Sequence, residues 1–154
     1  ELIDKLFRAG VDMLVETGFF NPDMGRDMMV TEREILEGIR KAPKRLRLGS
    51  GKDEVVCERR RGNSHARPII QGGPTGAPVS EDLFVTMMQG YAQEPVVDTL
   101  VSGVMSTVEG HAPIANTPWE IKATVAEIRA VREGMYRAGR PGMGIYGLHI
   151  QAHE

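Results

Sequence analysis

The stretch from residue 68 to residue 101, PIIQGGPTGAPVSEDLFVTMMQGYAQEPVVDTLV, decides the fold. Its apolar start, residues 68–71, predicts a short buried strand, and the glycine-rich residues 72–76 predict a loop. Ser80 then precedes a helix that begins with two acidic residues, and a second strand is centred on residues 98–101. A strand, a loop, a helix and another strand in this order form the unit from which parallel sheets are built.

The same pattern continues towards the C-terminus. Thr117, with proline after it and Glu120 at the third helical position, predicts a helix start, and Gly139 and Pro141 predict its end. Residues 142–146 predict a third strand. The side chains expected to face the core are Phe84, Met87, Met88 and Tyr91 on the first helix and Ile121, Val125, Ile128, Val131 and Met135 on the second. The fold class is therefore α/β with a parallel sheet. Because a complete (β/α)8 barrel takes roughly 200 residues or more, the chain is either a small open sheet or the front part of a larger barrel.

Two helices and a hairpin are predicted before this region. Apolar spacing indicates a helix over residues 2–17, which Gly18 can end. Thr31 and Glu34 form a capping box at the start of a second helix, which Pro43 ends. Residues 45–48 and 54–59 flank a glycine-rich turn and predict a strand pair. We therefore divide the chain into helices and a basic hairpin (1–67), the first β/α units (68–147) and a tail (148–154).

The composition is that of an ordinary globular protein. The 154 residues carry 19 basic and 21 acidic side chains, and 41% of them are hydrophobic. The single Cys57 cannot form an internal disulfide bond, and no apolar run approaches the roughly 20 residues that span a bilayer. With no signal peptide, these features predict a cytoplasmic protein without a membrane segment. Since Glu1 is not a start methionine, we also expect a processed or trimmed chain, or a fragment.

Positive charge is concentrated between residues 41 and 67. That segment holds nine basic and three acidic residues, a local balance of +6. Such a segment could meet a phosphate or an acidic partner. It lacks the interleaved aromatic residues that stack on exposed bases, and the whole chain has a pI near 6.1, so we expect no nucleic-acid partner. The simplest interpretation is a solvated hairpin surface.

Three motifs are candidates for a functional site. The loop from Gly72 to Gly76 could direct N–H groups at a phosphate, but it matches neither G-x-G-x-x-G nor a P-loop and is more typical of a tight turn. His149 and His153 are four residues apart, but the glutamate of a metalloprotease motif is missing, so no metal site is predicted. Tyr146 ends the third strand, and the carboxyl ends of strands build the active sites of parallel α/β folds.

Three blocks of sequence, residues 68–82, 97–105 and 138–144, closely resemble the monomethylamine methyltransferases of methylamine-using methanogens. The likeness covers nearly the whole chain up to Gly147. It implies a (β/α)8 TIM barrel, here its N-terminal portion, in a homo-oligomeric enzyme of methanogenesis. The family moves a methyl group from monomethylamine to the cobalt of a separate corrinoid protein. The resemblance thus implies that the corrinoid is carried by a partner and that this chain binds no cofactor directly.

The defining residue of that family is pyrrolysine, encoded by an in-frame amber codon, and the resemblance places it at Tyr146. Pyrrolysine offers an electrophilic imine that can capture an amine, whereas a phenol only donates or accepts a proton. A tyrosine codon differs from amber by one base, so mutation or decoding of amber as tyrosine would explain the residue. Residues 148–154 no longer follow the family.

Two other functions remain open at the sequence level. The chain could be a non-catalytic α/β module that binds an anionic ligand at the loop from Gly72 to Gly76. It could also be a truncated paralogue that acts as an interaction partner of full-length subunits.

Overall fold

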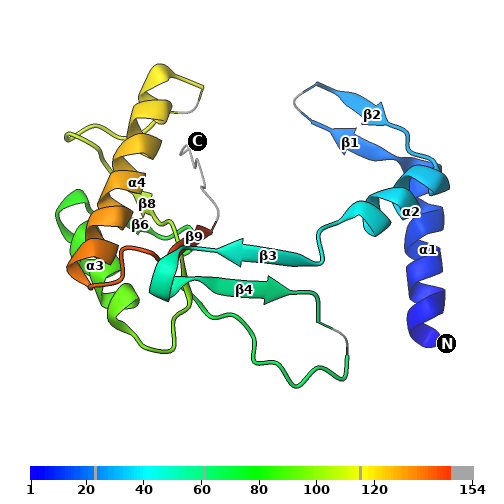
Figure 1. Cartoon of the computed structure of the whole chain (residues 1–154). Coiled ribbons are helices and arrows are strands. Elements are labelled where there is room, and N and C mark those ends of the chain that lie inside the picture. Colours follow the sequence, from blue (N-terminus) through cyan, green and yellow to red (C-terminus); the bar gives the residue numbers. More distant parts are fainter. Residues whose placement is uncertain (23, 61, 115, 147–154) are drawn as a thin grey trace. The chain divides into compact units, whose positions relative to one another are not determined.

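The computed structural model describes residues 1–22, 24–60, 62–114 and 116–146, which fold as a mixed α/β protein (Figure 1). The chain divides into two compact units, Glu1–Lys44 and Arg45–Glu154. The basic hairpin therefore belongs to the second unit. Within the described ranges, no helix combines the length and the apolar character needed to cross a membrane.

The first unit consists of two helices and a small hairpin between them. The predicted helices are confirmed as α1 (Leu2–Thr17) and α2 (Glu32–Lys41). Gly18 follows α1 with a positive φ of 69°, a conformation that glycine adopts at little cost. Between the helices, β1 (Phe19–Asn21) pairs antiparallel with β2 (Arg26–Met28), which the sequence analysis did not predict.

The capping box of α2 is present as predicted. The Thr31 N–H donates to the Glu34 carboxylate over 2.8 Å, and the Glu34 N–H donates to the Thr31 hydroxyl oxygen over 3.3 Å. The hydrogen bond from the Thr31 backbone holds the pKa of Glu34 below its ordinary value. An ion pair between Arg8 and Glu32 connects the two helices.

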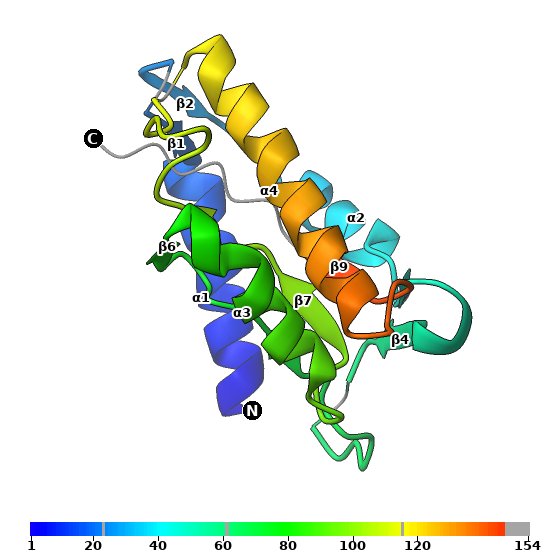
Figure 2. The same ribbon diagram turned by 90° about the vertical axis from the view of Figure 1, so that its left-hand side faces the viewer.

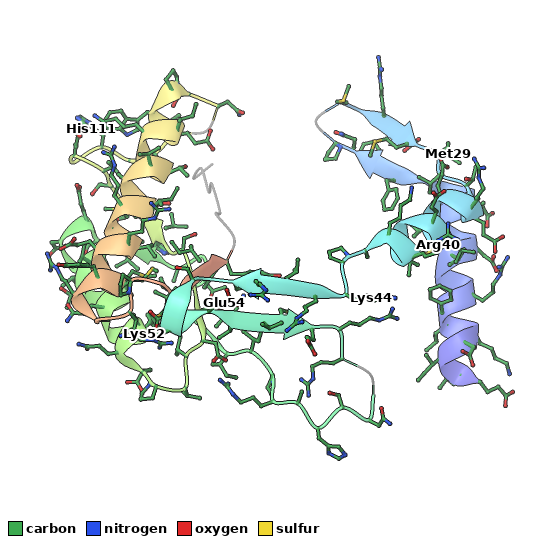
Figure 3. The ribbon with its side chains drawn as sticks, in the orientation of Figure 1. Met29, Arg40, Lys44, Lys52, Glu54 and His111 are labelled. Carbon is green, nitrogen blue, oxygen red and sulfur yellow. The ribbon has the colours of Figure 1, made fainter. Side chains whose placement is uncertain are left out.

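The second unit begins with the predicted basic hairpin. Its strands are β3 (Arg45–Leu48) and β4 (Val55–Glu58), which pair antiparallel with Leu48 opposite Val55. A single turn of 3-10 helix, η1 (Gly51–Asp53), lies in the connection. Figure 3 shows Lys52 at this turn and Glu54 just before β4.

A three-stranded parallel sheet follows, which confirms the predicted α/β arrangement. Its strands are β5 (Gln71–Gly72), β7 (Thr99–Val101) and β9 (Gly144–Tyr146), with β7 in the centre. Beyond the carboxyl ends of β5 and β7, β6 (Pro78–Val79) pairs in parallel with β8 (Val104–Met105). The first strand begins three residues later than predicted, because its partner β7 begins only at Thr99.

Two helices, α3 (Glu81–Gln93) and α4 (Pro118–Arg137), pack against each other, and Figure 2 shows them side by side in front of β7. The core between helices and sheet includes Phe84, Met88, Leu100 and Val131, each at most 1% exposed. These helices were predicted, and so were four of their buried residues, Phe84, Met88, Val131 and Met135.

The buried face of α4, however, differs from the predicted one. Ile121 is 67% exposed and Val125 is 40% exposed, so both predictions were wrong. Met87 of α3, also expected in the core, is 36% exposed. The residues of α4 that are buried are Ala123, Glu127, Val131, Gly134 and Met135. A Cβ atom at Gly134 would lie 2.8 Å from the Met88 Cβ, so the small residues of α4 let the two helices approach closely.

A partly buried ion pair connects the hairpin to the amino ends of the sheet strands. The Arg140 Nε donates to the Asp53 carboxylate over 3.3 Å, and the N–H of Gly142 donates to the other oxygen over 3.2 Å. Arg140 also donates through Nη1 to the carbonyl oxygens of Ala92 and Val97. One guanidinium thus connects the hairpin, the end of α3 and the amino end of β7, which places β3 and β4 beside β9.

Candidate functional site

A cavity of about 470 Å³ lies between the hairpin and the free face of the parallel sheet. The hairpin contributes Leu48 and residues 56–58, and the segment that follows contributes side chains between Arg59 and Ile69. The sheet contributes Gln71 and Tyr146. Its size falls within the range of small-molecule sites, roughly 300–1,000 Å³.

Tyr146 lies on the face of the sheet opposite the helices. Leu100 and Ile145 point into the core between sheet and helices, and successive side chains of a strand point to opposite faces. Tyr146, paired in register with Val101, therefore faces away from α3 and α4. Its side chain is 48% exposed at the carboxyl end of β9 and lines the cavity.

A polar layer lies one step nearer the amino ends of the strands. Gln71, Thr99 and Gly144 are paired in register there, so these three residues lie on the same face of the sheet as Tyr146. Thr99 is fully buried, and its hydroxyl oxygen has no hydrogen-bond partner among the described residues. Sequence reasoning did not single out Gln71 or Thr99, because a two-residue strand gives no recognisable alternation.

One wall of the cavity is held in place by an ion pair at the amino end of β7. Arg67 donates to both carboxylate oxygens of Asp98, which is only 5% exposed, and Asp98 also accepts the N–H of Ile70 over 2.9 Å. Burial alone would raise the pKa of Asp98, but the hydrogen bonds from Arg67 and Ile70 outweigh it and leave that pKa below its ordinary value. Arg67 is thus neutralised by its partner.

Two other arginines of the cavity are not neutralised. Within the described ranges, neither Arg59 nor Arg60 has a hydrogen-bond or ion-pair partner, and both are exposed. Glu58, the acidic residue of the lining, pairs with Arg45 at 3.3 Å. The cavity therefore carries excess positive charge. The basic segment was recognised from the sequence, but not that it borders the cavity of Tyr146.

The loop from Gly72 to Gly76 is explained by packing within the protein. Gly73 has a φ of +131°, and a Cβ atom there would lie 2.3 Å from the carbonyl oxygen of Val101. A Cβ atom at Gly103 would lie 2.4 Å from Pro74. These glycines allow the loop to lie against β7 and the residue pair that follows it, as expected of a tight structural turn.

The single cysteine and the two histidines near the C-terminus add little to the site. Cys57 lines the cavity and is partly buried. His149, His153 and the predicted tail 148–154 lie outside the described residues. In the part of the chain that the structure does describe, no three His, Cys, Asp or Glu side chains are grouped as metal ligands would be.

A polar cluster lies in the loop between β8 and α4. The Glu81 carboxylate accepts the N–H groups of Glu109 and Gly110, which lowers its pKa. His111 meets the ring of Trp119 edge-on at 5.6 Å, and Figure 3 shows His111 in this loop. These contacts shape the connection at the carboxyl ends of the strands and do not reach the cavity lining.

Parallel strands covered by helices on one face, with a cavity at a strand end on the other, define the class of α/β proteins that bind ligands at the carboxyl ends of their strands. A family model described as monomethylamine methyltransferase MtmB matches residues 1–153. The chain therefore belongs to the MtmB monomethylamine methyltransferase family.

Individual relatives agree with this assignment. The chain is 45% identical to monomethylamine methyltransferase MtmB3 of Methanosarcina barkeri and 44% identical to MtmB of Methanosarcina mazei, over 147 residues in each case. It is similar to the crystal structure of M. barkeri MtmB with a TM-score of 0.88 over 94% of this chain, at 44% identity, and equally similar to a hydroxylamine complex of MtmB. These matches cover 96% of this chain but only 32% of the length of the curated relatives.

Proposed function

We propose that this chain carries the amine-binding strand of a methyltransferase that moves a methyl group from monomethylamine to the cobalt of a separate corrinoid protein in methanogenesis. Membership of the MtmB family over residues 1–153 supports this proposal. The observation that carries it is the place of Tyr146, which ends β9 and lines a cavity of enzyme-site size. We also propose that β5, β7 and β9 are the first strands of a (β/α)8 barrel, whose carboxyl ends form the active site.

The side chain at position 146 decides the chemistry. The imine of pyrrolysine can take up the amine nitrogen at its carbon and so orient the methyl group for transfer. A tyrosine offers a hydroxyl group and no electrophilic carbon. We therefore propose that methyl transfer requires pyrrolysine at position 146 and that the tyrosine form lacks it.

A chimera with M. barkeri MtmB tests the proposal. Residues 1–146 of this chain replace the matching third of that enzyme, with either tyrosine or pyrrolysine at position 146. Methyl transfer from monomethylamine to a Co(I) corrinoid protein is followed by the visible spectrum of the cobalt. We expect transfer only in the pyrrolysine version. A folded but inactive pyrrolysine chimera would contradict the assigned function, and activity in the tyrosine version would contradict the role of position 146.

The other expectations of the sequence analysis stay predictions. They are that the active form is a homo-oligomer, that it works in the cytoplasm, and that the corrinoid stays on its partner. The alternative of an interaction partner for full-length subunits has its own test. Co-purification of this chain with an intact methyltransferase would favour it, because that outcome needs no chemistry at Tyr146.

A further inference from the structure

We propose that the first unit joins two copies of this chain through an antiparallel contact between the apolar faces of their α1 helices, which cross at Gly10. The methyl transfer proposed above places its chemistry at Tyr146, in the second unit, so this inference does not depend on it. The resemblance to the family implied a homo-oligomer, but that expectation does not say which surface forms the contact.

The first argument is the apolar surface that the first unit leaves uncovered. Among the described residues of this unit, Val11 is the single apolar side chain that is buried. The ion pair between Arg8 and Glu32 joins α2 to a side of α1 that lies away from Gly10. Around Gly10, one apolar stripe at helical spacing remains open, with each of these side chains at least 60% exposed: Leu2, Ile3, Leu6 and Met13. A unit with so small a core gains stability when a partner covers this stripe.

The second argument is that the apolar pattern of α1 is the same in both directions from Gly10. Leu6 and Leu14 lie four residues to either side of it. Phe7 and Met13 lie three residues to either side. A two-fold axis at Gly10 therefore brings Leu6 against the second copy's Met13. It also brings Phe7 against the second copy's Leu14. Such self-complementarity is the requirement for a contact between two identical surfaces.

The third argument is the glycine at the centre of the stripe. Glycine in the middle of a helix costs stability relative to alanine. Apart from the neighbouring turns of α1 itself, no atom of the described structure lies within 4 Å of the place where a Cβ atom of Gly10 would stand. No packing contact within the described chain therefore requires a glycine here. A second helix that crosses at this point does, because the distance between packed helices is set by the side chains at the contact.

The fourth argument is the charge along one edge of the stripe. Lys5 and Glu16 are eleven residues apart, which is about three helical turns, so they lie on the same edge near opposite ends of α1. Among the described residues, Glu16 has no ion-pair partner. In the antiparallel contact, Lys5 of each copy meets Glu16 of the other. The polar side of α1 also disfavours a membrane as the partner, because helices that bind anionic membranes are rich in Lys and Arg, whereas α1 carries three acidic and two basic residues.

Sedimentation equilibrium on the whole 154-residue chain tests the inference. We expect a monomer–dimer equilibrium. Leu6→Glu places a charge in the centre of the contact and should weaken the dimer at least about tenfold. Leu36→Glu is the matched control, since Leu36 is an exposed leucine on α2 of the same unit. It should change the dissociation constant less than about twofold. A monomeric parent chain, or equal effects of the two changes, would overturn the proposal.

An exchange of charges tests the antiparallel direction. Lys5→Glu and Glu16→Lys should each weaken the dimer about threefold, because each change replaces attraction with repulsion in two exposed pairs. The variant with both changes restores the pairs in reversed order, so its dissociation constant should return to within about twofold of that of the parent chain. A double variant that is weaker than either single variant would show that these side chains do not meet, which would contradict the antiparallel contact.

Cysteine cross-linking locates the crossing point. In a Cys57→Ser background, Leu6→Cys and Met13→Cys should form a disulfide-linked dimer when the two variants are mixed and oxidised, since a disulfide bond requires Cα atoms within about 7 Å. Neither variant should cross-link alone. Cross-linking of Leu6→Cys with itself would indicate parallel helices and would overturn the proposal.

Two further measurements show that each variant is folded. Far-UV circular dichroism reports the helices, and the fluorescence of Trp119 reports the second unit. None of the experiments uses an amine or a corrinoid protein. Failure of the α1 contact is therefore distinguishable from failure of the proposed methyl transfer.

Discussion

Buried carboxylates are paired with arginines at the amino ends of the parallel strands, whereas a buried carboxylate beyond the carboxyl ends has no cation as its partner in the described part of the chain. At the amino ends of the strands, Asp53 is paired with Arg140 and Asp98 with Arg67. Beyond the carboxyl ends, Glu127 is only 5% exposed, yet among the described residues it accepts a single backbone N–H, that of Met105, over 2.7 Å. Burial raises the pKa of Glu127, and the hydrogen bond from Met105 offsets only part of this effect.

This contrast separates stabilising from functional parts of the unit. The paired carboxylates hold the hairpin against the amino ends of the strands. In parallel α/β folds, this end of the sheet contributes mainly to stability. The carboxyl ends carry Tyr146 and the cavity, and there the side chains are exposed or only partly satisfied. A fold of this kind can vary residues at the carboxyl ends with little effect on its stability.

The largest loss of unfolding free energy is expected when the Arg140–Asp53 ion pair at the amino ends of the strands is broken. Arg140→Met leaves the buried Asp53 carboxylate without its cation and also removes the donors to Ala92 and Val97. The loss of one partner of a buried pair should cost about 3–5 kcal/mol of unfolding free energy. Urea unfolding followed by the fluorescence of Trp119, the single tryptophan, reports on this unit.

The control for that experiment is Arg45→Met, which removes the cation of the exposed pair between Arg45 and Glu58. Exposed pairs contribute little, so its unfolding curve should stay close to that of the parent chain. Equal losses in the two variants would contradict the assignment of Arg140 as the fastening of the hairpin.

A change at Glu127 is expected to increase stability, by an amount of intermediate size. Because its pKa is raised in the folded state, the folded protein resists ionisation, and stability falls as the pH rises through that pKa. Glu127→Gln stays neutral and keeps an oxygen that can accept the Met105 N–H. At pH 8 we expect the thermal midpoint to rise by about 4 °C, the shift that about 1 kcal/mol produces in a unit of this size.

The pH dependence provides the decisive check for this prediction. Near pH 4, below the ordinary glutamate pKa, the carboxyl group is protonated in both states and the advantage of glutamine should vanish. Glu133→Gln, an exposed change on the same helix, should show no such trend. A stabilisation that does not vary with pH would point to packing and not to the charge.

The smallest effect on stability is expected at the carboxyl end itself. Tyr146 is half-exposed, and no hydrogen bond of its hydroxyl group is formed with another described residue. Tyr146→Phe should change the unfolding free energy by less than about 0.5 kcal/mol. By contrast, Leu100→Ala on the neighbouring strand removes a fully buried side chain and should cost about 2–5 kcal/mol. A large loss from Tyr146→Phe would show that this residue belongs to the core and not to a site.

The local elements were largely predictable because their signals are local. The Thr31 capping box, the glycine after α1 and the proline at the start of α4 act within one or two turns of chain, and the structure confirms the helices they mark. The parallel sheet followed from alternation of strands and helices. The position of Tyr146 at a strand end was predictable for the same reason, although its catalytic role remains a prediction.

The partners of those elements were not predictable. Periodicity shows that α4 has apolar positions, but it does not show that Ala123 would be buried and Gly134 would lie against α3 while Ile121 stays exposed. Likewise, Asp53 and Arg140 are 87 positions apart in the chain, so no local pattern indicates their ion pair.

The sequence by itself determined the helices, the basic hairpin, the strands of the parallel sheet and their order, the family, and the place of residue 146 at the end of a strand. Only the tertiary structure decided which face of α4 is buried, which carboxylates are paired, and that the basic segment borders the cavity of Tyr146. The physical reason is the distance along the chain over which each kind of interaction acts. Helix caps and turns act between near neighbours in the chain, whereas close packing and the pairing of buried charges depend on groups that only folding brings together.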